Sequence, residues 1–429
     1  MLLKKTNDIK SIFKTFWEEK VFKIALFVHL FYLILGVILT LTVIREFNDF
    51  LVFYEVGKVF IKDIKNLYDP TNYLWPFRYF PLMGIFFVPF SLLPFEFAFI
   101  FFNIFSLFIK LLICVILYKI MGLICKDNES NPNNKIYYIS LYLIALPHAF
   151  NYTMGQVNSL VTIMVLISLY IMLKYKNIGY DFLGGLCIGM SINIKPITAF
   201  IIPFLITFSI YSRNRPFNRK ELKHSIIRII GVIFPLFLNI ILFLIIPELL
   251  NGFLEINFTG TETLKVNNSF SITKLIINFL VMLNLDVNFL KNLQVILFFL
   301  ILLILGGLGF LIFIYRKVEK NAVLYGFILG IVITLLVYFD SWDLHLIVLI
   351  PLLLISLISL EDKMNPSKES LSLQNIIEKS VYFFVFIDLL FFGLMYLLED
   401  IFPYNFIPTI FLLLIYVSIG KYLLTKRNE

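Results

Sequence analysis

Cysteine is scarce in this chain of 429 residues, which contains only three. Cys114, Cys125 and Cys187 lie in or beside apolar segments and have no paired spacing. The sequence therefore predicts neither a disulfide framework nor a zinc site, and small core side chains are the expected role. An internal repeat is also missing, and no polar segment is long enough to form an inserted soluble domain.

Hydrophobic residues dominate what is present. They make up 60% of the chain, the mean hydropathy is +0.91, and apolar runs of bilayer-spanning length recur. A β-barrel would show shorter alternating segments, so the composition predicts an all-α polytopic membrane protein. The net charge of +8 comes from basic residues in short loops and at the chain ends. That pattern orients membrane proteins, so no nucleic-acid partner is predicted.

The basic segments predict how the chain is oriented. No cleavable signal peptide is visible, because residues 1–21 are polar and basic and the apolar run 22–44 is long enough to remain as the first span. The lysines of 1–21 place the N-terminus in the cytoplasm. The same rule makes 361–379 and the C-terminus cytoplasmic, and 45–78 and 248–292 outward loops. We expect one membrane domain, residues 1–429, in the cell membrane.

Bilayer length predicts about twelve full crossings. Segments 79–93 and 97–124 both look apolar, yet only one net crossing fits before the basic segment that follows them. Because 79–93 is short and bounded by prolines, we interpret it as a half-helix or re-entrant element packed in protein. The alternative is that 136–150 fails to cross.

The candidate catalytic residue is Asp49, which opens the first sizeable polar loop after a span. A carboxylate there could remove a proton from an acceptor hydroxyl. Asp63 and Asp69 lie further along the same loop and stay open as alternative bases. A helix cap or a solvated loop charge is the simpler explanation for each.

Three other polar sites fall at expected outward helix ends. Lys195 precedes Pro196, and a proline at a helix start leaves backbone donors free for an anion beside the ammonium group. His345 is the histidine that lies next to an acid-rich outward loop, where it could donate to a phosphate or exchange a proton. Gln156 and Asn158 supply neutral hydrogen-bonding groups at another helix boundary.

These residues belong to an ordered series of short motifs. After Asp49, with Tyr54 five residues on, the series continues with Leu67-Tyr68-Asp69, Tyr79-Phe80-Pro81-Leu82, Gly155-Gln156-Val157-Asn158, Ile194-Lys195-Pro196, Asn267-Asn268-Ser269 and Ser341-Trp342-Asp343-Leu344-His345. In order and spacing this series resembles glycosyltransferase family 87, polytopic GT-C enzymes that include mannosyltransferases using polyprenol-phosphate-mannose.

The resemblance implies a GT-C-type helical bundle whose first outward loop bears juxtamembrane helices. It implies Asp49 as catalytic base and Lys195 and His345 on the donor phosphate. The residues themselves require no metal, and no cofactor is expected. The expected substrate-binding residues are Tyr54, Tyr68, Asp69, Tyr79, Gln156, Asn158, Asn267, Ser269 and Trp342. The implied partners are a polyprenyl-phosphate-sugar donor, with mannose as the sugar, a lipid or glycan acceptor on the outer face, and membrane lipids.

A secondary transporter or flippase for a lipid-linked or anionic solute is the alternative. That function predicts repeat symmetry and paired broken helices around a site at the bilayer midplane. The polar residues instead gather toward one face of the membrane, which favours the enzyme.

Overall fold

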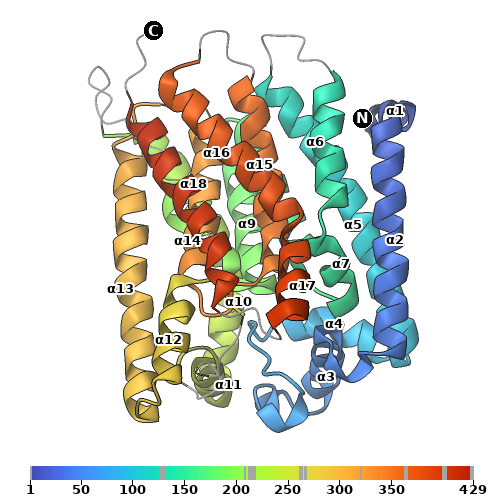
Figure 1. The fold of residues 1–429 in the computed structure, drawn as a ribbon, viewed down its shortest axis with the longest axis vertical. Coiled ribbons are helices and arrows are strands. Elements are labelled where there is room, and N and C mark those ends of the chain that lie inside the picture. Colours follow the sequence, from blue (N-terminus) through green and yellow to red (C-terminus); the bar gives the residue numbers. More distant parts are fainter. Residues whose placement is uncertain are drawn as a thin grey trace.

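The protein is a bundle of α-helices, as the sequence predicts (Figure 1). The computed structural model describes residues 2–125, 132–206, 209–210, 219–259, 264, 268–318, 321–361, 366–398 and 403–425, and these residues contain no β-strand. The α-helices are α1 (Leu2–Glu18), α2 (Lys20–Thr42), α3 (Asp49–Lys62), α4 (Met83–Ser91), α5 (Phe95–Ile124), α6 (Pro132–Ile144), α7 (Pro147–Met154), α8 (Asn158–Lys174), α9 (Ile178–Ile194), α10 (Arg219–Ile245), α11 (Pro247–Leu254), α12 (Ile272–Met282), α13 (Val287–Ile314), α14 (Ala322–Val337), α15 (Leu346–Glu361), α16 (Lys368–Val385), α17 (Ile387–Leu398) and α18 (Ile407–Leu424). Short helical turns are η1 (Arg45–Phe47), η2 (Ile64–Asn66), η3 (Pro70–Asn72), η4 (Pro196–Leu205), η5 (Glu255–Thr259), η7 (Asp343–His345) and η8 (Tyr404–Phe406).

Six helical segments of the described chain are long and apolar enough to cross a membrane: α2, α5, α10, α13, the segment formed by η7 and α15, and the segment formed by η8 and α18. The pair α16 and α17 becomes a seventh if its 53° bend is taken as a break within one span. Five shorter apolar helices, α8, α9, η4, α12 and α14, accompany them. The polytopic helical class is therefore confirmed, while the count of about twelve crossings stays a prediction.

The segment 79–93 forms only the short helix α4. Its nine residues extend about 13 Å at ~1.5 Å per residue, which is less than half the hydrocarbon thickness of a bilayer. By contrast, α6 and α7 follow one another with only Ala145 and Leu146 between them. These lengths favour 79–93 as the element that does not cross.

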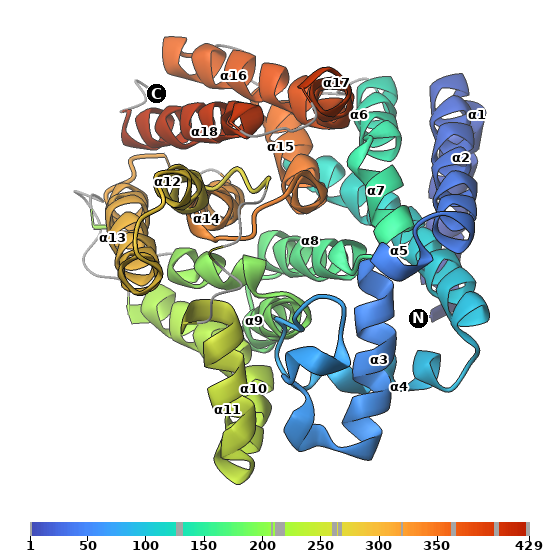
Figure 2. The same cartoon turned by 60° about the horizontal axis from the view of Figure 1, so that its bottom comes forward.

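The two ends of the bundle differ. In Figure 1, α1 and the end of α18 lie at the upper end, while α3, α4 and α11 lie at the lower end. The expected loop 45–78 folds as η1, α3, η2 and η3, so it contains a helix, α3, whose position beside the membrane stays a prediction. Figure 2 brings this lower end forward and shows α8 and α9 between α3 and α4 on one side and α14 on the other.

Helices α9 and α10 pack backbone to backbone, because glycines face the contact. A Cβ atom on Gly185 would lie 2.0 Å from the carbonyl oxygen of Arg228, and one on Gly231 would lie 2.3 Å from that of Phe182. Small residues permit such close approach between membrane helices. The tight contact fixes α9, which ends at Lys195.

Candidate active site

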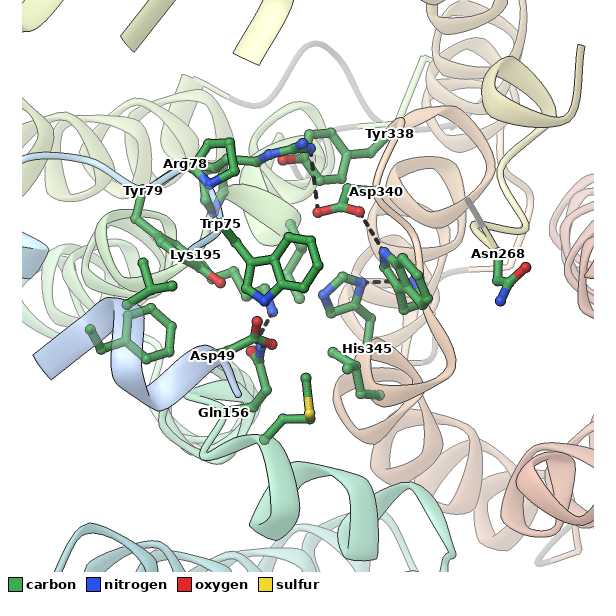
Figure 3. Close-up of a pocket in the computed structure, with 18 residues that line it drawn as sticks. Asp49, Trp75, Arg78, Tyr79, Gln156, Lys195, Asn268, Tyr338, Asp340 and His345 are labelled. Carbon is green, nitrogen blue, oxygen red and sulfur yellow. Dashed lines mark hydrogen bonds and ion pairs between the residues drawn. The ribbon is translucent and has the colours of Figure 1, made fainter. Parts of the chain in front are cut away.

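A cavity of about 530 Å³ opens among segments that are far apart in the sequence (Figure 3). Its lining residues are Asp49, Val52, Phe53, Trp75, Pro76, Arg78, Tyr79, Met154, Gln156, Lys195, Pro196, Ile197, Asn268, Tyr338, Asp340, Trp342, Leu344 and His345. Six of the predicted site residues are in this set: Asp49, Tyr79, Gln156, Lys195, Trp342 and His345. The fold thus brings the candidate base, cation and histidine into one chamber.

Asp49 begins α3 because the preceding residue caps that helix. The Asn48 side chain accepts a hydrogen bond of 2.9 Å from the backbone N–H of Leu51, which leaves Asp49 in the first turn. A carboxylate in the first turn is stabilised by the helix dipole. The Asp49 Oδ2 atom accepts a hydrogen bond from the Gln156 side chain. Its other oxygen therefore has no partner among the described residues and is available to a ligand.

Gly155 brings Gln156 to Asp49. It ends α7 in the left-handed region at φ 62°, which glycine adopts without strain. A Cβ at Gly155 would lie 2.5 Å from the Cβ of Phe50, so glycine also allows the turn to pack directly on α3. The positive φ and the close packing on α3 therefore explain why the motif Gly155-Gln156 has a glycine at its first position.

Lys195 ends α9, and Pro196 begins η4. The residue before a proline is biased toward extended backbone, and Lys195 has φ −157° and ψ 122°. Its Nζ donates to Gln156 Oε1 at 2.9 Å and to Asn158 Oδ1 at 3.0 Å. An ammonium group has three donors, so one remains for the cavity.

The loop between α14 and α15 holds His345. The backbone N–H of Trp342 donates to His345 Nδ1 at 3.2 Å, which in a neutral imidazole assigns the proton to Nε2. Hydrogen bonds to the segment that precedes α12 hold this loop in place. Ser341 N–H donates to Ser269 Oγ at 3.0 Å, and Phe270 N–H donates to the Ser341 carbonyl at 3.0 Å. His345 is consequently a fixed hydrogen-bond donor beside the cavity.

Twelve of the eighteen lining residues were not predicted as site residues, and they include Trp75, Arg78, Tyr338 and Asp340. The Arg78 guanidinium pairs with Asp340 at 3.4 Å, and Asp340 also accepts from the Trp342 indole N–H. Figure 3 shows this pair across the chamber from Asp49. The sequence contains a signal for two of these residues, because Arg78 directly precedes the motif that begins at Tyr79 and Asp340 directly precedes the motif that begins at Ser341.

Five predicted substrate-binding residues lie outside the cavity lining: Tyr54, Tyr68, Asp69, Asn158 and Ser269. The hydroxyl of Tyr54 donates to the Leu93 carbonyl at 2.8 Å, and that of Tyr68 donates to the Tyr79 carbonyl at 2.6 Å. Both therefore brace the first loop. Asn158 and Ser269 are fully buried and support Lys195 and Ser341. The remaining predicted residue, Asn267, lies outside the described residues.

The two alternative bases also lie outside the lining. The Asp63 carboxylate accepts from Lys65 N–H at 3.2 Å and from the Asn66 side chain at 2.8 Å. The Asp69 carboxylate accepts from the backbone and the hydroxyl of Thr71 at 2.9 and 2.7 Å. Each carboxylate caps a short turn, as the simpler explanation predicts.

Burial sets the protonation behaviour of the base. Desolvation raises the pKa of Asp49 to about 6, against the lowering effect of the Gln156 hydrogen bond and the Lys195 charge. Desolvation lowers the pKa of Lys195 to about 8, and the negative charges of Asp49 and Asp340 oppose that shift. A base with a pKa near 6 is ionised at neutral pH and is a stronger proton acceptor than a free aspartate.

The residues described by the structure form no group of three or more His, Cys, Asp and Glu side chains arranged to hold a metal ion. The polar groups that surround the chamber instead suit hydroxyls and anions. Lys195 and His345 each present a donor, and Asp49 presents an acceptor.

Comparison with known proteins identifies the family. The model of glycosyltransferase family 87 matches residues 77–338, which is more than half of the chain. No curated protein matches the sequence. The matched range contains Arg78, Tyr79, Gln156 and Lys195, whereas Asp49 and His345 lie beyond its two ends. This chain therefore belongs to glycosyltransferase family 87 and is a membrane glycosyltransferase.

Proposed function

We propose that the enzyme transfers a sugar from a polyprenyl-phosphate donor to a hydroxyl of a lipid or glycan acceptor, with mannose as the sugar. The observation that carries the proposal is the shared chamber of Asp49, Lys195 and His345. A carboxylate base and fixed cationic or neutral donors within one poorly hydrated chamber suit displacement of a phosphate by a hydroxyl.

In the proposed reaction the acceptor oxygen attacks the anomeric carbon, and its proton passes to the free oxygen of Asp49. The bond between the anomeric carbon and the phosphate oxygen breaks at the same time, and the electron pair leaves with the polyprenyl phosphate. The third Lys195 donor and His345 Nε2–H stabilise the charge that develops there. Attack opposite to the leaving group inverts the anomeric configuration. A phosphate leaves without a general acid, so one carboxylate suffices.

The rest of the chamber suits a sugar. Trp75 and Trp342 are two of the three tryptophans in the chain, and both line the cavity. Large aromatic side chains supply apolar contact area, while Arg78 and Asp340 supply polar groups that fix orientation. Membership of a glycosyltransferase family favours this function over the transporter alternative.

We place the chamber on the outer face of the cell membrane, with both termini in the cytoplasm. Helix α1, the end of α13 and the end of α18 lie at the upper end of the bundle in Figure 1. In the sequence these segments carry the basic residues Lys10, Lys14, Arg316, Lys317 and Lys421. Basic residues favour the cytoplasmic side. Since α3 and its Asp49 lie at the other end, the charge distribution supports an outward active site.

The test is release of polyprenyl phosphate from radiolabelled polyprenyl-phosphate-mannose by purified protein in liposomes that contain lipid extract. We expect Asp49→Asn to reduce the rate about 10²- to 10⁴-fold, the usual contribution of a general base. The matched variants Asp63→Asn and Asp69→Asn remove a carboxylate from the same loop and should retain the rate of the unaltered protein.

Two results would contradict the proposal. An Asp49→Asn protein as active as the unaltered enzyme would exclude Asp49 as the base. Absence of turnover by the unaltered enzyme, with polyprenyl-phosphate-glucose as well as the mannose donor, would exclude this donor class.

A further inference from the structure

The Gln156 carboxamide hydrogen-bonds to both the candidate base and the candidate cation, and the three side chains lie together in Figure 3. We propose that Gln156 is a positioning residue that keeps Lys195 out of an ion pair with Asp49, so that base and cation act as separate groups. This inference rests on the proposed function.

Hydrogen bonding at both ends of one side chain supports the inference. Gln156 Nε2 donates to Asp49 Oδ2, and Gln156 Oε1 accepts from Lys195 Nζ at 2.9 Å. A carboxamide offers one donor end and one acceptor end, so it satisfies the anion and the cation together. A glutamate would repel Asp49, and an apolar side chain would bond neither group.

A second amide, that of Asn158, also holds Lys195. Asn158 Oδ1 accepts from Lys195 Nζ at 3.0 Å, and the Asn158 amide donates to Asn151 Oδ1 at 2.9 Å and to the Leu344 carbonyl at 3.1 Å. Asn158 is fully buried. Lys195 thus gives two of its three donors to neutral oxygens, and within the described part of the chain no carboxylate forms an ion pair with it.

This separation has a chemical consequence. A direct Asp49–Lys195 ion pair would favour the carboxylate, which makes it a weaker base, and would neutralise the ammonium charge needed by the leaving phosphate. The other ionisable groups that interact with Asp49 are Asp340 and Arg78, which pair with each other, and Tyr79. Gln156 is therefore the side chain that decides whether the Lys195 ammonium group contacts Asp49 directly or keeps its third donor for a ligand.

Backbone packing and burial restrict the conformation of Gln156. Gly155 packs against Phe50 of α3, and the Gln156 N–H donates to the Asn151 carbonyl at 3.0 Å. Gln156 itself is almost completely buried. The side chain consequently has little freedom to leave the gap between the two charges.

The test compares Gln156→Leu and Gln156→Glu, which should move the pH dependence in opposite directions. The unaltered enzyme should lose donor turnover below about pH 6, because protonated Asp49 cannot act as a base. In Gln156→Leu the loss of the Gln156 hydrogen bond raises the pKa of Asp49, whereas direct contact with Lys195 lowers it. The inference requires the direct contact to outweigh the lost bond, so the acid limb should move down by about one pH unit, with a lower plateau, and an upward shift would overturn it. In Gln156→Glu the added negative charge should move the limb up by a similar amount.

The controls use Gln374, a partly buried glutamine of α16 that lies outside the cavity lining. Gln374→Leu and Gln374→Glu should leave the acid limb unchanged. Infrared titration of the Asp49 carboxyl band, assigned by its loss in Asp49→Asn, gives the same shifts without requiring activity.

The outcomes separate the inference from the function on which it rests. Donor turnover and carboxyl titration that both stay at the values of the unaltered enzyme in the Gln156 variants would overturn the inference. Lower rates with an unmoved acid limb and an unmoved carboxyl band would also overturn it, because they indicate a merely structural role. Lack of turnover by the unaltered enzyme rejects the proposed function alone, since the infrared titration still decides the role of Gln156.

Discussion

At the residue scale, the fixed tautomer of His345 gives a direct prediction. Its Nδ1 accepts from the Trp342 backbone, so Nε2–H is the group that can reach a leaving phosphate. We expect His345→Phe to reduce donor turnover about 10²- to 10³-fold, the usual loss for one fixed donor to developing negative charge. His345→Gln retains an N–H donor and should recover part of the rate. Single-turnover measurements on both variants make the comparison.

The two variants control for each other, because both replace the ring that accepts the Trp342 N–H. A His345→Gln enzyme as slow as His345→Phe would assign the loss to loop structure. Equal rates in His345→Phe and the unaltered enzyme would remove His345 from phosphate stabilisation altogether.

Sequence reasoning singled out Asp49, Lys195 and His345, which line one cavity, because charged groups at the ends of apolar runs are costly. It could not separate ligand-facing tyrosines from bracing ones, since Tyr54 and Tyr68 differ from Tyr79 only in where their side chains point. It also could not foresee long-range pairing between the first loop and the α14–α15 loop. The Arg78–Asp340 pair is visible only once the fold brings those loops together.

At the element scale, the α9–α10 contact gives a prediction about stability. A methyl group at Gly185 would lie 2.0 Å from the Arg228 carbonyl oxygen, so Gly185→Ala should push the helices apart. The same shift disturbs the buried Asp181, which pairs with Arg228 at 2.6 Å and with His224 at 2.5 Å. We expect Gly185→Ala to lower the free energy of unfolding by about 1–3 kcal/mol, as overpacking does. Thermal unfolding in detergent measures the change.

Gly307 of α13 is the matched control, because a Cβ atom there would meet open space, with no neighbouring atom of the described residues within 4 Å. An alanine there lacks a steric penalty, and glycine costs a helix about 0.5–1 kcal/mol relative to alanine. Gly307→Ala should therefore raise the unfolding temperature. The changes in unfolding temperature of the two variants need not be equal in size. A Gly185→Ala protein that is more stable than the unaltered protein would contradict the packing argument.

The positions of helix breaks could be predicted from the apolar pattern and segment length only in part. The half-helix at 79–93 was foreseeable from its prolines, and α4 is short as expected. Apolar runs alone could not predict that α9 and η4 meet at a break that exposes Lys195 to the cavity, nor that α16 and α17 bend by 53°. Such breaks depend on neighbouring helices that satisfy the freed backbone groups.

At the scale of the whole molecule, hydropathy predicts which segments are in the membrane but not which are central. In the most apolar part of the segment formed by η7 and α15, 94% of the residues are buried, whereas in that of α13 only 11% are buried, although both are strongly apolar. Lipid and protein interior are both apolar solvents, so composition cannot separate them. Only the packed structure identifies α15 as central and α13 as peripheral.

The orientation of the molecule in the membrane can be tested directly by labelling introduced cysteines. The three native cysteines interfere little with such labelling. Cys114 and Cys125 are buried and Cys187 is partly buried, so a variant lacking all three is a practical background. Into it we would introduce Lys65→Cys, exposed in the first loop near the chamber, or Lys10→Cys, exposed on α1. If the basic end of the bundle is cytoplasmic, a membrane-impermeant maleimide should label Lys65→Cys on intact cells and should label Lys10→Cys only after permeabilisation.

The reverse pattern would put the chamber inside, where the donor would have to present its sugar to the cytoplasm. Equal labelling of both sites on intact cells would mean that the chain lacks a single orientation, and the charge argument would then fail for this protein.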